Sequence, residues 1–271
     1  MLAGVTLLPG CIIVTGGHSH VARGSLAAST AAGPSRDVAI GELSRIDVTA
    51  TPETLDLGSR NGSLVIIVDE SATGLGITAD VRCGGDDAAE AEARLASVAL
   101  DVVEQDGGVV QVRPRMPGGW RSGDGVNLEV RMPVSAAVIG RTSNGSIRIE
   151  GARGPIDLET TNGAIELRDT AGAVLARTSN GRIDVADHLG GLDIATSNGA
   201  ITIRLNPDSD APVVARTSNG SVEFRAGSAF GGVLDARTSN GRIQVDGLAR
   251  IAGPTTLERH PGRVQLTLAG T

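Results

Sequence analysis

Four arginines occupy the same position of a repeated motif, and together they could bind an anion. Each stands four residues before the glycine of an Asn-Gly pair: Arg141, Arg177, Arg216 and Arg237. Guanidinium groups form charge-assisted hydrogen bonds with carboxylates and phosphates, so this column could hold a polyanion or an acidic glycan. The alternative is that Glu166, Asp184 and Glu223 neutralise the column, which would then serve solubility.

The motif that positions these arginines is Thr-Ser-Asn-Gly or a close copy. Its Asn-Gly pairs follow one another at steps of 18 or 21 residues: Asn144-Gly145, Asn162-Gly163, Asn180-Gly181, Asn198-Gly199, Asn219-Gly220 and Asn240-Gly241. A period near 20 residues is typical of a repeat architecture. Apolar residues alternate on both sides of each pair, which predicts half-buried strands. Because Asn and Gly both tolerate positive φ, we expect a tight turn at each pair.

Two all-β topologies fit this pattern. In a β-solenoid with about two strands per coil of 18–21 residues, Arg141, Glu159 and Arg177 stack on one another, which is favourable. In an antiparallel meander or sandwich, a hairpin places Glu159 opposite Glu166, which is repulsive. We therefore favour the solenoid, with the threonine of each motif inside and the serine outside. Gly262 lies 21 residues after Gly241, so we expect one more, atypical coil at the C-terminal end.

The chain before the repeats divides into further segments. Residues 136–271 form the regular repeat region, and residues 37–135 are expected to form an irregular β region. That region contains one short helix near residues 86–96, with aspartates suited to its N-terminus, which we expect to cover an open coil end. Residues 12–36 are rich in Gly, Ser, Ala and Thr and have the composition of a flexible linker.

The first 11 residues resemble the end of a lipoprotein signal peptide. Leu8-Pro9-Gly10-Cys11 is similar to a lipobox, in which the cysteine receives the lipid, although no basic segment precedes the apolar run. The alternative is an apolar terminus with an unrelated cysteine. The lipobox predicts a bacterial, extracytoplasmic protein anchored to a membrane through Cys11.

Composition argues against several classes of function. The chain has a net charge of −7, one Trp, two Phe, no Tyr and, among its 24 basic residues, no Lys. Binding of nucleic acid usually needs a basic face with stacking aromatics, so no nucleic acid partner is expected. Trp120 is, with the arginine column, a candidate contact for a glycan. A polysaccharide-active enzyme would have Trp120 as its one indole platform and no Lys or Tyr base.

The remaining chemistry-bearing residues have simple interpretations. Cys83 ends an alternating strand, which favours a small half-buried side chain over a reactive thiol. His18 and His20 lie in the linker, and His188 has only Asp184 and Asp187 near it in sequence, so no zinc site is expected. Asp208 and Asp210 could hold Ca²⁺, but Asn-Pro-Asp-Ser-Asp also makes an ordinary turn. The outward serines could form an ice- or glycan-binding array, but charged residues interrupt it: Ser143, Ser179, Ser197, Ser218 and Ser239.

A helix-containing β region followed by tandem Thr-Ser-Asn-Gly-x-Ile-x-Ile/Val copies resembles a bacterial family of β-strand-repeat domains labelled putative adhesins. The resemblance covers about residues 37–268 and implies an envelope-associated solenoid without a catalytic site. We therefore expect a non-enzymatic structural or adhesin-like interaction module with no cofactor or metal, whose partner is an envelope protein or glycan. The alternatives are a polysaccharide-active β-helix enzyme and an envelope-stress sensing module that recruits a partner by strand addition.

Overall fold

The computed structural model describes residues 12–14, 20–22, 29–32, 37–48, 51–133, 136–227, 230–247, 255–260 and 262–268. The chain divides into two compact units, Met1–Ala136 (unit 1) and Ala137–Thr271 (unit 2). The fold is nearly all-β with a β-solenoid of about five turns, as the repeat predicted. Cys11 and His18 lie outside the described residues.

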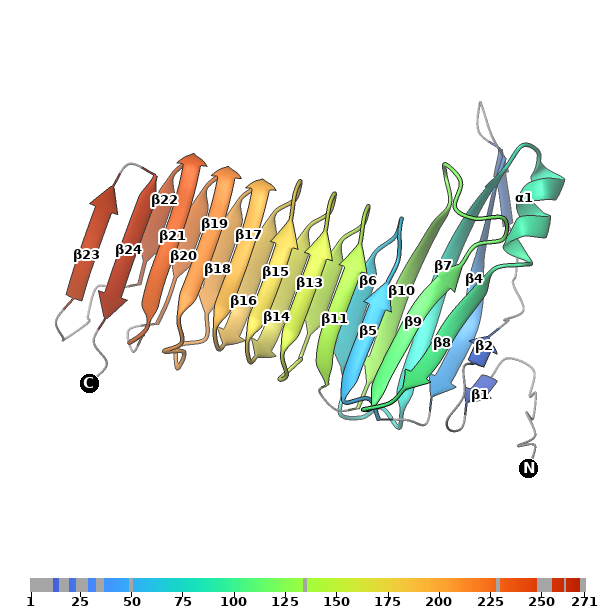
Figure 1. Cartoon of the computed structure of the whole chain (residues 1–271), viewed down its shortest axis with the longest axis horizontal. Helices are drawn as coiled ribbons and strands as arrows, with labels where there is room; N and C mark the ends of the chain where they lie inside the picture. The colour runs from blue at the N-terminus through green and yellow to red at the C-terminus, as the bar shows by residue number, and fades with distance from the viewer. Residues whose placement is uncertain are drawn as a thin grey trace. The chain divides into compact units, whose positions relative to one another are not determined.

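Unit 2 is a stack of two-stranded coils (Figure 1). One strand of each coil joins one sheet: β11 (Ala137–Thr142), β13 (Ile156–Thr160), β15 (Val174–Thr178), β17 (Leu192–Asn198), β19 (Val213–Asn219) and β21 (Val233–Asn240). The other strand joins the second sheet: β12 (Ile147–Glu150), β14 (Ile165–Ala171), β16 (Ile183–Leu189), β18 (Ile201–Leu205), β20 (Val222–Arg225) and β22 (Ile243–Asp246). Each strand pairs in parallel with its counterpart in the next coil, so the meander alternative is wrong.

The register of these pairs is the one that the charge argument required. Arg141 pairs with Glu159, and Glu159 pairs with Arg177. Opposite charges are therefore stacked at these three positions, whereas Arg216 and Arg237 pair with each other further along the same sheet. The repeat period and the charges of Arg141, Glu159 and Arg177 thus agree with the solenoid.

The core of unit 2 consists of ladders of like apolar residues. Ile165, Ile183 and Ile201 stack in successive coils, and each is 0% exposed. Burial of such a side chain contributes about 1.5–3 kcal/mol. At the wider C-terminal coils Phe224 and Phe230 meet edge to face, with ring centroids 5.5 Å apart. The alternating apolar residues of the sequence are thus the inward faces of the coils.

The Asn-Gly corners are closed by hydrogen bonds between coils. The buried Thr160 donates its hydroxyl to the carbonyl oxygen of Gly145 at 3.0 Å, and the same bond recurs in every later coil through Thr238. The exposed asparagines form a ladder in which each Nδ2 donates to the Oδ1 of the preceding coil at 2.8–2.9 Å. The repeated Thr and Asn therefore bond coil to coil.

The reason for glycine at these corners differs from the expectation. Neither Gly163 nor Gly181 has a φ in the left-handed region. A Cβ on Gly181 would stand 1.9 Å from the carbonyl oxygen of Gly163, so the close stacking of backbones requires glycine. Left-handed φ values occur instead at the other corner, where Asp187 has φ 55° and Gly172 has φ 106°.

The C-terminal strands correct the expectation of one more parallel coil. β23 (Thr255–His260) and β24 (Arg263–Leu268) pair antiparallel with each other, and β24 pairs antiparallel with β21. Alternating residues such as Val264 and Leu266 fit either strand direction, so the sequence pattern did not distinguish the two. The chain reverses direction here and a hairpin continues the sheet of β21.

Unit 1 is a mixed β structure with one helix among its described residues. Its longer strands are β4 (Asp37–Val48), β5 (Thr54–Gly58), β6 (Leu64–Val68), β7 (Leu75–Gly85), β8 (Ala99–Gln105), β9 (Val109–Arg115) and β10 (Gly125–Met132). β7 pairs antiparallel with β4 and β10, and β8 pairs antiparallel with β9, whereas β6 and β5 pair in parallel with β10 and β9. Unit 1 thus combines parallel and antiparallel strand pairs.

The helix of unit 1 begins as predicted. α1 (Ala88–Leu95) has Asp87 as its N-cap, whose carboxylate accepts a hydrogen bond from the Glu90 N–H at 2.8 Å. Its buried face packs against β7 and β4. The helix therefore packs on the two longest strands described in this unit.

The segment expected to be a linker contains short strands. These are β1 (Ile12–Val14), β2 (His20–Ala22) and β3 (Ser29–Ala32). β1 and β3 pair with β4, and β2 pairs with β8. Backbone pairing to existing sheet edges thus orders segments whose composition alone indicated a flexible chain.

Candidate functional site

The predicted arginine column lies on the outer face of the sheet that contains β11 to β21. Its members are half-exposed, and each one contacts an aspartate: Arg141 with Asp157 at 2.9 Å, Arg177 and Arg216 with Asp193 at 3.7 and 3.0 Å, and Arg237 with Asp235 at 2.5 Å. The Arg237 guanidinium holds the pKa of the Asp235 carboxyl below its usual value. The structure brings these arginines together in one column, with its positive charge balanced within the same sheet.

The neutralising acids are not the ones expected from the sequence. Glu166, Asp184 and Glu223 project from the other sheet and pair there with Arg168, Arg204 and Arg225. Instead, the arginines pair with Asp157, Asp193 and Asp235. Each aspartate lies two residues before the column position of its own strand, and side chains at i and i+2 project from the same face of a strand. Each of the two sheets of unit 2 has an outer face, which we call a flat face, and each flat face thus carries its own ion pairs.

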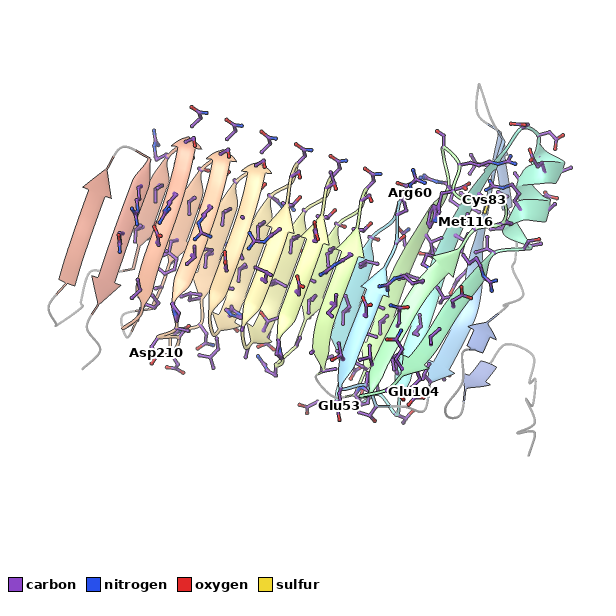
Figure 2. All side chains as sticks on the ribbon, viewed as in Figure 1. Glu53, Arg60, Cys83, Glu104, Met116 and Asp210 are labelled. Carbon is purple, nitrogen blue, oxygen red and sulfur yellow. The ribbon has the colours of Figure 1, made fainter. Side chains whose placement is uncertain are left out.

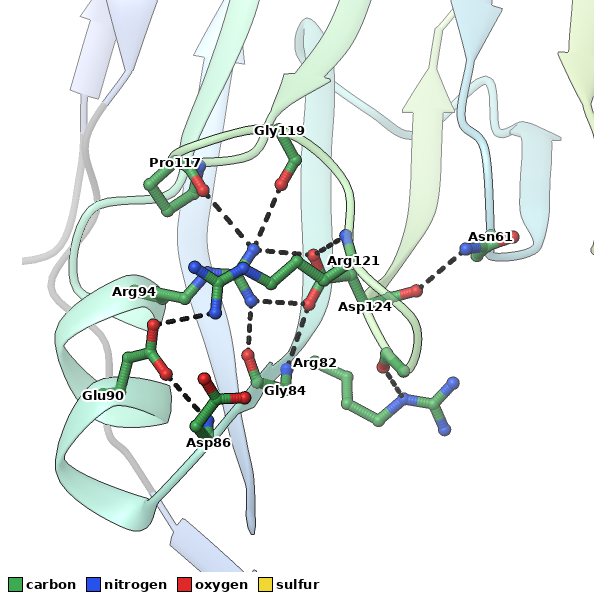
Figure 3. Close-up of polar contacts among 11 residues, drawn as sticks. Asn61, Arg82, Gly84, Asp86, Glu90, Arg94, Pro117, Gly119, Arg121 and Asp124 are labelled. Atoms are coloured by element: carbon green, nitrogen blue, oxygen red, sulfur yellow. Dashed lines mark hydrogen bonds and ion pairs between the residues drawn. The ribbon is translucent and has the colours of Figure 1, made fainter. Parts of the chain in front are cut away.

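A buried ion pair in unit 1 lies at the centre of a cluster of polar contacts (Figure 3). Arg94 of α1 contacts Asp124 at 2.8 Å, with the two side chains 7% and 0% exposed. Arg94 also donates to the carbonyl oxygens of Gly84 and Gly119. Asp124 accepts from the N–H groups of Gly84 at 3.0 Å and Arg121 at 2.7 Å. The pair therefore joins the helix, the end of β7 and the loop before β10.

The hydrogen bonds at this pair set its charge state. Burial alone would raise the pKa of Asp124, but the hydrogen bonds from Arg94, Arg121 and Gly84 lower it below its usual value. Cys83 lies beside the pair and is fully buried (Figure 2). Burial, together with the negative charge of Asp124, raises the pKa of its thiol to about 11. Cys83 is thus a neutral, unreactive thiol at neutral pH.

A surface pocket of about 440 Å³ opens next to the cluster. It is lined by Gly84, Gly85, Asp86, Arg121 and Ser122. The guanidinium of Arg121 is held by Glu90 at 2.7 Å, and Glu90 also accepts from the Asp86 N–H. Trp120 is half-buried in the same loop, in unit 1, whereas the arginine column belongs to unit 2.

Sequence reasoning missed the Arg94–Asp124 pair because the two residues are 30 positions apart and form no motif. The one available signal was an arginine on the apolar face of a short helix, which requires a carboxylate partner when buried.

The other candidates take structural positions. His188 is 0% exposed, and its Nδ1 lies 2.9 Å from the Thr170 hydroxyl. The side-chain oxygen of Asn206 accepts a hydrogen bond from the Asp208 N–H, so the longer loop is an ordinary Asx turn. Asp210 in the same loop is exposed (Figure 2). Among the residues that the structure describes, no group of three His, Cys, Asp or Glu side chains could hold a metal, and no helix could span a membrane.

Comparison with known proteins gives only distant similarity. No protein-family model matches the chain, and no curated protein matches it significantly. A crystal structure of a putative adhesin from Bacteroides fragilis is similar at 10% identity and a TM-score of 0.46, over 78% of this chain and 97% of that one. A putative cell adhesion protein from Clostridium sporogenes is similar at 12% identity and a TM-score of 0.36, over 75% and 97%. Similarity at this level assigns no function.

Proposed function

We propose that this chain is a non-enzymatic interaction module of the bacterial cell envelope, tethered to a membrane through a lipid on Cys11. The observation that carries the proposal is the use of the repeated polar residues. Their hydrogen bonds are made between coils, as Thr178 bonds Gly163 and Asn180 bonds Asn162. The repeat thus builds a rigid framework that presents flat, charged faces, the arrangement suited to holding a partner.

From the sequence, the arginine column and Trp120 were the expected contacts for a glycan or an envelope protein. Their surroundings support a scaffold role for the column, since Asp157, Asp193 and Asp235 already hold its guanidinium groups. Catalysis would need an acid and a base converging on one cleft. The pocket of unit 1 does not support such a role, because the polar groups around it pair with one another, as Arg121 does with Glu90.

Fractionation of cells that express the parent chain and Cys11→Ser tests the tether. We expect the parent in the membrane fraction, with detergent needed for its release, and the variant in the soluble fraction. Metabolic labelling with a fatty acid should mark the parent and leave the variant unlabelled. A Cys83→Ser variant serves as the control, because it removes the other cysteine and should leave both results unchanged. Equal membrane association of parent and Cys11→Ser would refute the lipid tether.

A further inference from the structure

The Asn-Gly corners of unit 2 form a surface whose charge differs from that of the rest of the chain. We define the Asn-Gly ridge as residues 143–146, 161–164, 179–182, 197–200, 218–221 and 239–242. These segments contain no Asp or Glu, although the whole chain has a net charge of −7. They contain two arginines, Arg182 and Arg242, both exposed. The ridge is therefore a positively charged edge on an acidic protein.

Arg182 and Arg242 differ from the other arginines of unit 2. Every other arginine of this unit whose side chain the structure describes forms an ion pair: Arg141, Arg148, Arg153, Arg168, Arg177, Arg204, Arg216, Arg225, Arg237 and Arg263. No carboxylate among the described residues lies within ion-pair distance of Arg182 or Arg242. Glu166 is influenced by Arg182 at longer range but is hydrogen-bonded to Arg168. Two guanidinium groups thus remain for an external anion.

The ridge around these arginines is held by hydrogen bonds between coils. Asn180 donates one of its two amide N–H groups to Asn162 and accepts from Asn198, which leaves its other N–H for a ligand. Because coils repeat at about 4.8 Å, Arg182 and Arg242, three coils apart, are separated by about 14 Å along the stack. A preorganised row of donors loses little conformational entropy on binding. Its length suits a polymer better than a single small anion.

We propose that the Asn-Gly ridge binds an anionic polysaccharide. Acid groups repeated along such a polymer pair with Arg182 and Arg242, and its hydroxyl groups bond the asparagine amides and serine hydroxyls between them. No aromatic residue lies on the ridge for the base stacking that single-stranded nucleic acid needs. The ridge also has no large apolar residue that would insert into a lipid surface. The inference rests on the proposed role as an interaction module and names the ligand class of that module.

The test measures binding of the purified full-length chain to polygalacturonate, to dextran sulfate and to neutral dextran of similar length, by titration calorimetry at low and high salt. The ridge variant is Arg182→Gln/Arg242→Gln. The matched control is Arg204→Gln/Arg225→Gln, which removes the same charge from ion-paired arginines of the flat face. We expect the parent to bind an acidic polymer in a salt-dependent way and not the neutral one. The ridge variant should lose about tenfold in affinity, and the control less than about twofold.

Several results would overturn the proposal: no preference for acidic over neutral dextran-type polymers, an equal loss in the two variants, or tighter binding to single-stranded DNA or to phosphatidylserine vesicles than to either glycan. A difference between polygalacturonate and dextran sulfate identifies carboxylate or sulfate as the preferred acid. All substituted side chains are exposed or half-exposed, so circular dichroism should show an unchanged fold. Failure of this binding leaves the membrane tether untouched, since the tether is measured separately by fractionation.

Discussion

Gly163 stacks on Gly145 so closely that a Cβ on Gly163 would lie 1.8 Å from the carbonyl oxygen of Gly145. The same relationship recurs up the stack, as between Gly181 and Gly163 at 1.9 Å. Non-bonded heavy atoms do not approach to this distance, so only glycine allows the corners to stack in register. The threonine and asparagine bonds of the corner depend on that register. One residue type thus sets the geometry on which the whole Asn-Gly ridge is built.

Substitution of one corner glycine should therefore destabilise the solenoid. Gly181→Ala places a methyl group against the backbone of Gly163, which has no flexible side chain that could yield. We expect a loss of about 1–3 kcal/mol, measured as a lower midpoint of urea unfolding. Gly191→Ala is the matched control, because its Cβ would meet only the Pro212 carbonyl oxygen at 3.7 Å, an ordinary contact. Equal effects of the two variants would show that close stacking is not the reason for glycine at the corner.

The asparagine ladder makes a prediction that depends on position. Asn180 takes part in two amide–amide bonds of 2.8 Å, whereas Asn240, in the last corner of the ladder, takes part in one of 2.9 Å. Each bond is exposed and contributes about 0.5–1.5 kcal/mol. Asn180→Ala should therefore lower the unfolding midpoint about twice as much as Asn240→Ala.

The neighbouring Ser179→Ala provides the control for the ladder, since Ser179 is exposed and its hydroxyl forms no hydrogen bond with any residue that the structure describes. This variant should unfold as the parent does, within about 0.5 kcal/mol. If Asn180→Ala is as stable as Ser179→Ala, the ladder contributes nothing, and the repeated geometry of the corner comes from the glycines and threonines alone.

The strands of the solenoid were predictable because their signals are local and repeated. The alternation around Ile165 and Ile183 marks the inward faces, and the charges of Arg141, Glu159 and Arg177 select parallel stacking over hairpins. The sequence does not say why a glycine is needed, since Gly181 could serve a positive φ or a close approach. It also leaves strand direction open near the C-terminus, where β24 runs antiparallel to β21.

The polar sites were less predictable because their members are brought together only by folding. In the sequence, Asp124 is an aspartate in a Gly-rich loop and Arg94 is a charged residue of a short helix, and no motif links the two. The partners of the arginine column were misassigned because Glu166 is close in the repeat but projects from the other sheet. The lack of acids on the Asn-Gly ridge is visible in the sequence. That Arg182 and Arg242 are available for an anion follows only from the structure, which shows which arginines are already paired with Asp or Glu.

The buried pair of unit 1 should be costly to break from one side. Asp124→Asn leaves the guanidinium of Arg94, which is 7% exposed, without a counter-charge. We expect a loss of about 3–5 kcal/mol in the unfolding free energy of unit 1. Asp101→Asn is the control, because its pair with Arg115 is exposed and should be worth less than about 1 kcal/mol.

A double variant separates charge burial from net stabilisation at the same site. Arg94→Met/Asp124→Leu removes both charges together, so no buried charge is left unpaired. It should be more stable than Asp124→Asn, since replacement of a buried pair by apolar groups avoids the desolvation penalty. A double variant that is less stable than Asp124→Asn would mean that the hydrogen bonds to Gly84, Gly119 and Arg121 hold the loop independently of the charges.

His188 should make the solenoid sensitive to mild acid. Its side chain is fully buried beside Thr170, and its Nε2 has no hydrogen-bond partner in the structure. Burial lowers the pKa of His188 below its usual value and outweighs the opposing influence of the surrounding backbone. The unfolded chain therefore binds a proton at a higher pH than the folded chain does. Stability should be unaffected at pH 7.5 and should fall as the pH drops below about 6.5, by up to about 1.4 kcal/mol per pH unit.

The next coil suggests a control variant, because Leu205 occupies there the position that pairs with His188. Thr170→Val/His188→Leu replaces the polar pair by the apolar residues typical of the core, so no hydroxyl is left without a partner. Unfolding free energies measured from pH 7.5 to 5.5 should decline for the parent and decline less for this variant. That range lies above the ordinary pKa of carboxylates, so their protonation contributes little to the difference. Equal slopes for parent and variant would show that His188 accepts a proton in the folded coil as readily as in the unfolded chain, and that this part of the core admits water.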